Sequence, residues 1–191
     1  MIRRDAALRL LAERFDTEIV VGAYSTAFDW IHIRPRHPLN FTSVGAMGLA
    51  SSHGLGFALA CPDRRVIVLD GDGSLLMNLG SLVTIGNLQP ANLVHFVFEN
   101  GTYEANGGHP TPARERTDFA GLARAAGYAL AVSFEDFVEL EERLDAILAA
   151  QGPIFVALKV VPGEDSPRDY GVLYAAEARD ALRAELQGSS R

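Results

Sequence analysis

The sequence is poor in cysteine and contains no long hydrophobic run. Among its 191 residues there is one cysteine, Cys61, so no disulfide can form within the chain, and a cysteine-ligated iron–sulfur cluster in this chain is excluded. A lone cysteine is typical of a reducing compartment, and we expect a cytoplasmic protein. No apolar run approaches the roughly 20 residues of a membrane span. Arg3-Arg4 leads into an amphipathic helical pattern, so no signal peptide is predicted.

Positive charge is also scarce. One lysine, Lys159, stands beside sixteen arginines, and the formal net charge is −7. This acidic balance argues against nucleic acid or an anionic membrane as a partner. The remaining composition is typical of a soluble globular protein, with 48% hydrophobic and 21% charged residues. The length predicts a single domain over residues 1–191.

The stretch from residue 66 to 110 contains no lysine or arginine, and it is the most informative part of the chain. A short apolar run, Val66–Leu69, predicts a strand. It ends in Asp-Gly-Asp-Gly-Ser at 70–74, after which apolar residues return at helical spacing. A second run, Leu93–Phe98, ends in Glu99-Asn100-Gly101. Because the carboxyl ends of parallel strands meet at one sheet edge, we expect these polar residues to lie close together.

This edge has the chemistry of a site for a diphosphate held through a divalent cation. Glycine lets the backbone approach a ligand, and the free N–H groups at a helix start favour an anion. A hard cation such as Mg²⁺ would balance the phosphate charge, with Asp72, the Asn100 amide and a backbone carbonyl just beyond it as oxygen donors. The alternative is that Asp-Gly and Asn-Gly are ordinary turn dipeptides. The 28-residue gap between Asp72 and Asn100 favours the site, because it fits one helical crossover.

Helical and strand patterns alternate along the rest of the chain. Two prolines within residues 34–38 indicate a loop, and the region from about 163 is a polar link to a helical tail. The alternation predicts an α/β fold, a three-layer, mostly parallel sheet with helices on both faces and a ligand at the carboxyl ends of the strands. We expect helices over 5–15, from 44 to about 60, from 74 to 85, from a Thr117 cap to Gly127 and after a Ser133–Asp136 capping box, with further strands at 18–23, 129–132 and 154–161.

Gly71-Asp72-Gly73-Ser74, followed after one crossover by Asn100-Gly101-Thr102-Tyr103, resembles the GDG…N motif of thiamine-diphosphate enzymes, in the domain that binds the diphosphate. The resemblance implies the thiamine-diphosphate-binding fold, with thiamine diphosphate and Mg²⁺ as cofactors. It implies that Asp72 and Asn100 are side-chain ligands of Mg²⁺ and that the Thr102 carbonyl is the third protein ligand. The family usually has a second Asn just before the ligand position, where this sequence has Glu.

The resemblance also implies which residues contact the diphosphate. Ser25 and Thr26, at the end of the strand expected over 18–23, would contact it, although either could instead only cap the following helix. Motif residues beside the metal complete the expected diphosphate side of the site: Gly71, Gly73, Ser74 and Tyr103.

A small-residue segment, 44–52, is where the aminopyrimidine ring docks in the resembling family. Gly45 would offer its carbonyl to the exocyclic amine, Ala46 would lie beside it, and Met47 would be the apolar wedge that bends the cofactor into a V. Taken alone, Met47 would be read as core filling. The flanking glycines and the downstream motif favour the wedge.

Within this family the sequence especially resembles the β subunits of sulfopyruvate decarboxylases and the matching part of phosphonopyruvate decarboxylases. The similar segments are GAMGLASS at 45–52, LDGDGSLLM at 69–77 and the run from Asn100 to Gly108. That last segment closes over the substrate side of the cofactor in the family, so Glu104 and His109 are the candidate catalytic residues. His109 stands where the group tends to have Gln.

The resemblance therefore implies the diphosphate-binding β subunit of a decarboxylase that converts a small 2-oxo acid to CO₂ and an aldehyde. It also implies a separate α subunit, because the glutamate that activates the pyrimidine belongs to another domain of about 150 residues. Two alternatives stay open. One is a subunit of a carboligase or synthase of the same cofactor class, and the other is a non-catalytic module that binds a nucleotide or diphosphate.

Overall fold

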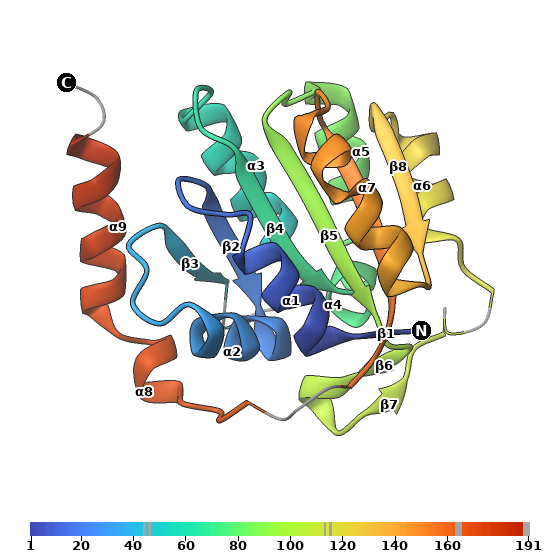
Figure 1. The fold of residues 1–191 in the computed structure, drawn as a ribbon, viewed down its shortest axis with the longest axis horizontal. Helices are drawn as coiled ribbons and strands as arrows, with labels where there is room; N and C mark the ends of the chain where they lie inside the picture. The colour runs from blue at the N-terminus through green and yellow to red at the C-terminus, as the bar shows by residue number, and fades with distance from the viewer. Residues whose placement is uncertain (44, 46, 113, 115, 163–165, 189–191) are drawn as a thin grey trace.

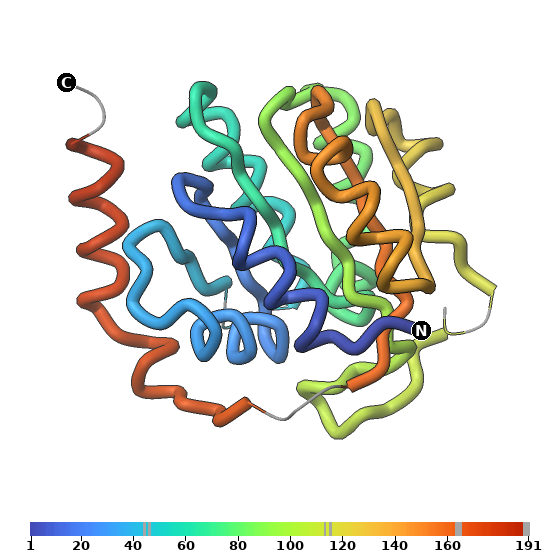
Figure 2. The backbone as a smooth tube through the Cα atoms, viewed as in Figure 1, coloured from blue at the N-terminus to red at the C-terminus, as the bar shows by residue number. Residues whose placement is uncertain are grey.

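A parallel sheet crosses the molecule, and helices cover both of its faces (Figures 1 and 2). The structure is a computed structural model that describes residues 1–43, 45, 47–112, 114, 116–162 and 166–188. Neighbouring strands of the sheet run parallel, which confirms the α/β class. In spatial order the strands are β1 (Ile2–Arg3), β9 (Ile154–Val161), β5 (Leu93–Glu99), β4 (Val66–Gly71), β2 (Ile19–Ala23) and β3 (Asn40–Ser43), while β8 (Leu130–Phe134) pairs with β9.

Alternate strand residues face two separate cores. Val66 and Val68 of β4 pack in one core with α3, α5 and α6, whereas Ile67 and Leu69 pack in the other with α1 and α7. This period-2 alternation produces the three layers that the sequence predicts. The helices are α1 (Arg4–Ala12), α2 (Tyr24–Ile33), α3 (Ala50–Ala60), α4 (Asp72–Leu76), α5 (Ser81–Leu88), α6 (Phe119–Ala126), α7 (Phe137–Ala149), α8 (Tyr170–Leu173) and α9 (Ala176–Gly188).

The order of the strands reverses between β2 and β4. The chain leaves β2 toward β3 on one side, and β4, β5 and β9 then follow one another on the other side. In open α/β sheets, a crevice that can take a ligand lies beyond the carboxyl ends of the strands at such a switch point. The chain segments that leave β2 and β4 therefore border the candidate site.

Two expected helices have different limits in the structure. The helix expected from residue 44 begins only at Ala50, because Gly45 and Gly48 have φ angles of 104° and 85°, outside the helical region. The helix expected over 74–85 is two helices, α4 and α5, joined by a turn at 77–80. The side chain of Asn78 in this turn donates a hydrogen bond to the Gly48 carbonyl at 3.0 Å. The turn between α4 and α5 is thereby connected to the segment before α3.

Two predicted caps were wrong by a few residues. The N-cap of α6 is Asp118, not Thr117, and its side chain accepts a hydrogen bond from the Gly121 N–H. The N-cap of α7 is Asp136, whereas Ser133 lies within β8. In both cases a carboxylate one to three residues nearer the helix caps the free N–H groups.

Short strands were missed altogether. β3 follows the loop expected at 34–38, and β6 (Thr102–Tyr103) pairs antiparallel with β7 (His109–Pro110) around the one-turn 3-10 helix η1 (Glu104–Asn106). β1, for which no prediction was made from the sequence, pairs with β9. Segments of two to four residues are too short to show a periodic pattern.

After β9 the chain continues into the expected terminal helix, α9, with the short α8 before it. The expected link begins at residues 163–165, which lie outside the described residues. Leu173 of α8 packs on Ala27 and Phe28 of α2, close to the start of that helix. In the part of the chain that the structure describes, no helix is long and apolar enough to cross a membrane.

Candidate functional site

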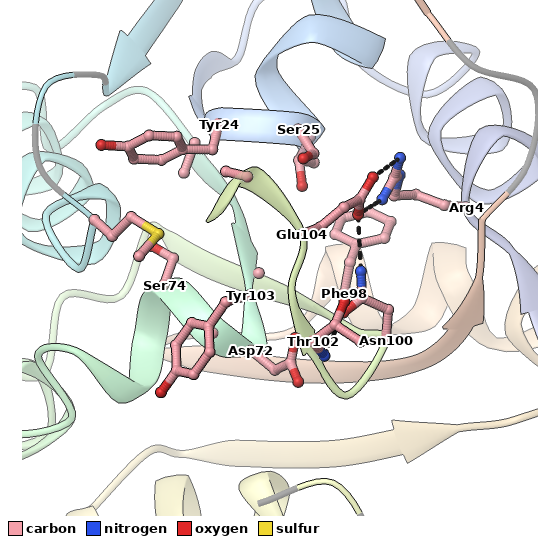
Figure 3. A pocket seen from close by; sticks show the side chains of 16 residues that line it. Arg4, Tyr24, Ser25, Asp72, Ser74, Phe98, Asn100, Thr102, Tyr103 and Glu104 are labelled. Carbon is pink, nitrogen blue, oxygen red and sulfur yellow. Dashed lines mark hydrogen bonds and ion pairs between the residues drawn. The ribbon is translucent and has the colours of Figure 1, made fainter. Parts of the chain in front are cut away.

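A cleft lies at the carboxyl ends of β2, β4 and β5 (Figure 3). Its walls come from the start of α2, the β4–α4 junction, the segment after β5 and Arg4 at the start of α1. Segments far apart in the sequence thus meet here, as the expected parallel sheet requires. Most of the residues that the sequence predicts for the site line this cleft: Ser25, Thr26, Met47, Gly71, Asp72, Gly73, Ser74, Asn100, Thr102, Tyr103 and Glu104.

Two predicted residues that the structure describes, His109 and Gly45, are not among those that line the cleft. His109 is exposed on β7, where it pairs with Tyr103 in the β6–β7 hairpin. Gly45 is exposed and does not line the cleft. Ala46 lies outside the described residues, so its predicted contact stays a prediction. The catalytic role predicted for His109 also stays a prediction.

The segment after β5 is fastened to the start of α4 through Asp72. The Asp72 side chain accepts a hydrogen bond from the Gly101 N–H at 3.0 Å and one from the Thr111 hydroxyl at 3.4 Å, through the same oxygen, Oδ2. Asn100 then closes a tight turn, because its Oδ1 accepts from the Thr102 N–H at 2.8 Å and from the Thr102 hydroxyl at 2.9 Å. The three predicted metal-binding residues are therefore held in one hydrogen-bonded unit.

Asp72 is only 1% exposed, and its environment disfavours negative charge. Burial raises the pKa of Asp72 to about 6, because the charged form loses its water, and the nearby Glu99 charge acts in the same direction. Backbone N–H groups of Gly73, Gly101 and Asn100 partly oppose this. A cation bound at this carboxylate would favour the charged form.

The chemistry of these donors fits a hard cation. One carboxylate, one amide oxygen and one backbone carbonyl match Mg²⁺, which usually keeps several waters and takes few protein ligands. Across the described ranges, no three His, Cys, Asp or Glu side chains gather as a metal-ligand cluster, and the predicted set includes only one such side chain. Asp72, Asn100 and Thr102 would hold the ion.

Gly73 is packed so closely that a larger side chain would clash with its neighbours. A Cβ at this position would lie 2.7 Å from Tyr103 Cδ1 and 3.2 Å from the Thr102 carbonyl oxygen. The first turn of α4 and the segment carrying Thr102 therefore approach each other closely only because residue 73 is glycine. The motif glycine is thus required by the packing beside the predicted metal ligand.

The start of α2 decides whether Ser25 or Thr26 caps that helix. The N-cap of α2 is Ala23, so neither Ser25 nor Thr26 caps the helix, and the capping interpretation was wrong. Both residues lie in the first helical turn and line the cleft. Tyr24, which sequence reasoning did not single out, has a φ of 43°, a region that side chains other than glycine rarely adopt. The Tyr24 hydroxyl hydrogen-bonds to the backbone of Gly45.

Glu104 lines the cleft but is not a free carboxylate. Arg4 donates to both of its oxygens, and Arg4 also donates from Nε to Asp29 at 2.7 Å. Sequence reasoning missed Arg4 and Asp29, which are 5% and 4% exposed. Nothing in the pattern of α1 marks Arg4 as buried, because a charged residue at a helix start is ordinarily solvated.

The chain belongs to the family described as "Thiamine pyrophosphate enzyme, C-terminal TPP binding domain", which matches residues 21–158. This confirms the family that the GDG…N motif predicts. Among solved structures, this chain is similar to an X-ray structure of a protein from Mycobacterium smegmatis that is described as a candidate thiamin diphosphate-dependent enzyme. The two structures match with a TM-score of 0.71 and 25% sequence identity, over 85% of this chain and 32% of that one.

Two curated relatives place the chain more closely. A phosphonopyruvate decarboxylase of Streptomyces viridochromogenes is 41% identical over 161 residues, which are 84% of this chain but 40% of that protein. The sulfopyruvate decarboxylase subunit beta of Methanothermobacter thermautotrophicus is 38% identical over 166 residues, 85% of this chain and 84% of the subunit. The chain therefore spans less than half of the first relative and most of the second.

Proposed function

We propose that this chain is the diphosphate- and Mg²⁺-binding β subunit of a thiamine-diphosphate-dependent decarboxylase that acts on a small 2-oxo acid of the sulfopyruvate or phosphonopyruvate type. The observation that supports it most strongly is the unit formed by Asp72, Asn100 and Thr102 at the ends of β4 and β5. Its donors suit a hard cation, and Gly73 beside them lets the segment that carries Thr102 pack closely against the start of α4.

Each part of the cleft has a task in this proposal. Asp72 and Asn100 hold the metal with the Thr102 carbonyl, while Ser25, Thr26 and Ser74 offer hydroxyl groups to the diphosphate. Bound thiamine diphosphate supplies the electron sink that lets CO₂ leave the substrate. Met47, half-buried in the cleft wall, gives an apolar surface against which the cofactor would bend.

A separate α subunit completes the proposed enzyme. The glutamate that activates the pyrimidine has to be free to hydrogen-bond to the ring. The two glutamates beside the predicted metal ligands in the sequence are already held in ion pairs. Glu104 is held by Arg4, and Glu99 is held by Lys159. The similar relatives of comparable length are named as beta subunits, which supports a heteromer.

The test is reconstitution. The tagged chain is purified from its own host, its associated protein is identified, and the two are mixed with sulfopyruvate, phosphonopyruvate or pyruvate while CO₂ and aldehyde are measured. We expect activity only with both chains, thiamine diphosphate and Mg²⁺, and loss of activity with EDTA. Enzymatic decarboxylation by the rigorously purified single chain would contradict the heteromer.

The same assay separates the two alternatives. A carboligase or synthase would give a longer hydroxy-keto product when an acceptor aldehyde or second 2-oxo acid is added. A non-catalytic module would bind ADP or ATP as tightly as thiamine diphosphate in calorimetry, and it would release no CO₂ from any of the 2-oxo acids. The proposal predicts neither result.

A further inference from the structure

A series of side-chain hydrogen bonds connects Arg4, near the N-terminus, through Glu104 to Asn100, a predicted metal ligand (Figure 3). Arg4 donates through two nitrogens to the Glu104 carboxylate, and the contact between Nη2 and Oε1 is 3.1 Å. Glu104 Oε2 in turn accepts from Asn100 Nδ2 at 2.8 Å. Arg4 lies outside residues 21–158, the part of the chain that matches the family.

Arg4, at one end of this series of hydrogen bonds, is held on two sides. Its guanidinium lies between Glu104 and Asp29, and the side chains of Arg4 and Asp29 are each 6% exposed. A fork of guanidinium nitrogens on one carboxylate fixes both distance and orientation. The two carboxylates already neutralise the single positive charge of Arg4, so Arg4 is not poised to bind an anionic substrate.

The Asn100 end has two possible orientations of its amide. An amide has an acceptor oxygen on one side and a donor NH₂ on the other. With Nδ2 donating to Glu104, the oxygen Oδ1 faces the Thr102 turn. The flipped amide would set its oxygen against the carboxylate and present N–H groups where a cation has to bind.

We infer that Glu104, clamped by Arg4, is a positioning residue rather than a catalytic acid or base: by accepting from Nδ2 it acts with the Thr102 turn, which donates to Oδ1, to fix the orientation of the Asn100 amide proposed to hold the metal. This inference rests on the proposed function, because it assigns Asn100 as a ligand. Both Glu104 oxygens are engaged, so no lone carboxylate oxygen is left to take up a substrate proton without breaking the clamp.

Glu99 offers a matched control. It is the same residue type, precedes Asn100 directly and is paired with one cation, Lys159, as Glu104 is with Arg4. Its charge also acts on Asp72. No hydrogen bond between the side chains of Glu99 and Asn100 is found in the described part of the chain. Comparing Glu104→Ala with Glu99→Ala therefore separates amide orientation from loss of charge or of an ion pair.

The measurement is the Mg²⁺ concentration that half-saturates thiamine diphosphate binding, by calorimetry on the chain with its partner subunit. Outer-shell changes at metal sites commonly cost about 10- to 100-fold in affinity, and we expect about tenfold for Glu104→Ala and less than threefold for Glu99→Ala. Glu104→Gln, which loses the negative charge and the second oxygen that accepts from Arg4 Nη2, should fall between them and serves if the alanine variant does not fold. Equal effects of the Glu104 and Glu99 changes would overturn the inference.

A second readout needs no cofactor. In the unliganded chain, NMR resonances of the Asn100 side-chain NH₂ are assigned through Asn100→Asp, and their exchange with solvent is measured. We expect exchange to be at least about fivefold faster in Glu104→Ala, because a hydrogen-bonded donor is lost to solvent. Unchanged exchange would overturn the inference. If wild type binds no thiamine diphosphate, the proposed function fails, while this readout still decides the orientation of Asn100.

Discussion

The two halves of the cleft are built differently. On the metal half, Asp72, Asn100 and Thr102 are fixed by hydrogen bonds within the chain, and Gly73 is packed against its neighbours. On the half expected to hold the pyrimidine, Gly45 is exposed, and a Cβ added there would meet nothing within 4 Å. The chain by itself orders the residues proposed to hold the metal and diphosphate, whereas Gly45 at the other end is exposed, as we expect if a partner subunit covers it.

The halves are not independent, because Gly48 connects them. The Gly48 N–H donates to the Ser74 hydroxyl at 3.0 Å, and its carbonyl accepts from Asn78, also at 3.0 Å. A Cβ at Gly48 would lie 2.9 Å from Asn78 Cβ. The segment that carries Gly45 is therefore attached through Gly48 to the first turn of α4. We expect a substitution to lower cofactor affinity more, the closer it lies to that packed turn.

The largest effect is expected from Asp72→Asn. Asparagine keeps an oxygen that can accept from the Gly101 N–H but removes the charge that holds Mg²⁺, so affinity for thiamine diphosphate with Mg²⁺ present should fall at least about 100-fold. Because burial raises the pKa of Asp72 to about 6, its ionised form destabilises the metal-free fold at pH 7. The variant should therefore melt at the same temperature as wild type or higher. Unchanged cofactor affinity would show that the metal is not held here.

The next largest effect is expected from Gly73→Ala. The new methyl group would meet Tyr103 and the Thr102 carbonyl, so the segment after β5 has to move. We expect about 1–3 kcal/mol lower stability from overpacking and a cofactor affinity lower by roughly tenfold or more. Denaturant unfolding and calorimetry measure the two. A variant as stable as wild type with full affinity would mean that the junction is looser than its packing indicates.

These sites differ in how far the sequence could predict them. The residues proposed to hold the metal could be named from the sequence, because they are local: they follow apolar strands closely and are flanked by glycine. β9 was predicted over its full length, Ile154–Val161, since a buried parallel strand is a continuous apolar run. The family match to residues 21–158 covers Asp72, Asn100 and Thr102 and most of β9.

What the sequence could not show depends on contacts between distant residues. Arg4 and Glu104 are 100 positions apart, and no local pattern joins them. The two-residue strands β6 and β7 have no periodicity, so the exposed position of His109 could not be foreseen. The late start of α3 depends on the positive φ angles of Gly45 and Gly48, which composition allows but does not require.

A moderate effect is expected from Met47→Ala on the open half. Met47 is half-buried in the cleft wall, and truncation removes the apolar surface proposed to bend the cofactor. We expect affinity for thiamine diphosphate to fall several-fold, up to about tenfold for a lost apolar contact of a few methylene groups. Met77→Ala is the control, because Met77 is 57% exposed and does not line the cleft. Equal affinities in the two variants would remove the wedge role.

The smallest effect is expected from Gly45→Ala. The site has space for a methyl group, so the cost is confined to the backbone: a φ of 104° suits glycine, and alanine there is strained by roughly 1–2 kcal/mol unless the exposed segment relaxes. Because the proposed contact to the pyrimidine uses the backbone carbonyl, which alanine retains, cofactor affinity should change by less than about threefold. The comparison with Gly73→Ala is then direct, since both variants add one methyl group to a glycine predicted to contact the cofactor. A loss at Gly45 as large as at Gly73 would mean that the open half is ordered in the assembled enzyme as tightly as the metal half is in this chain.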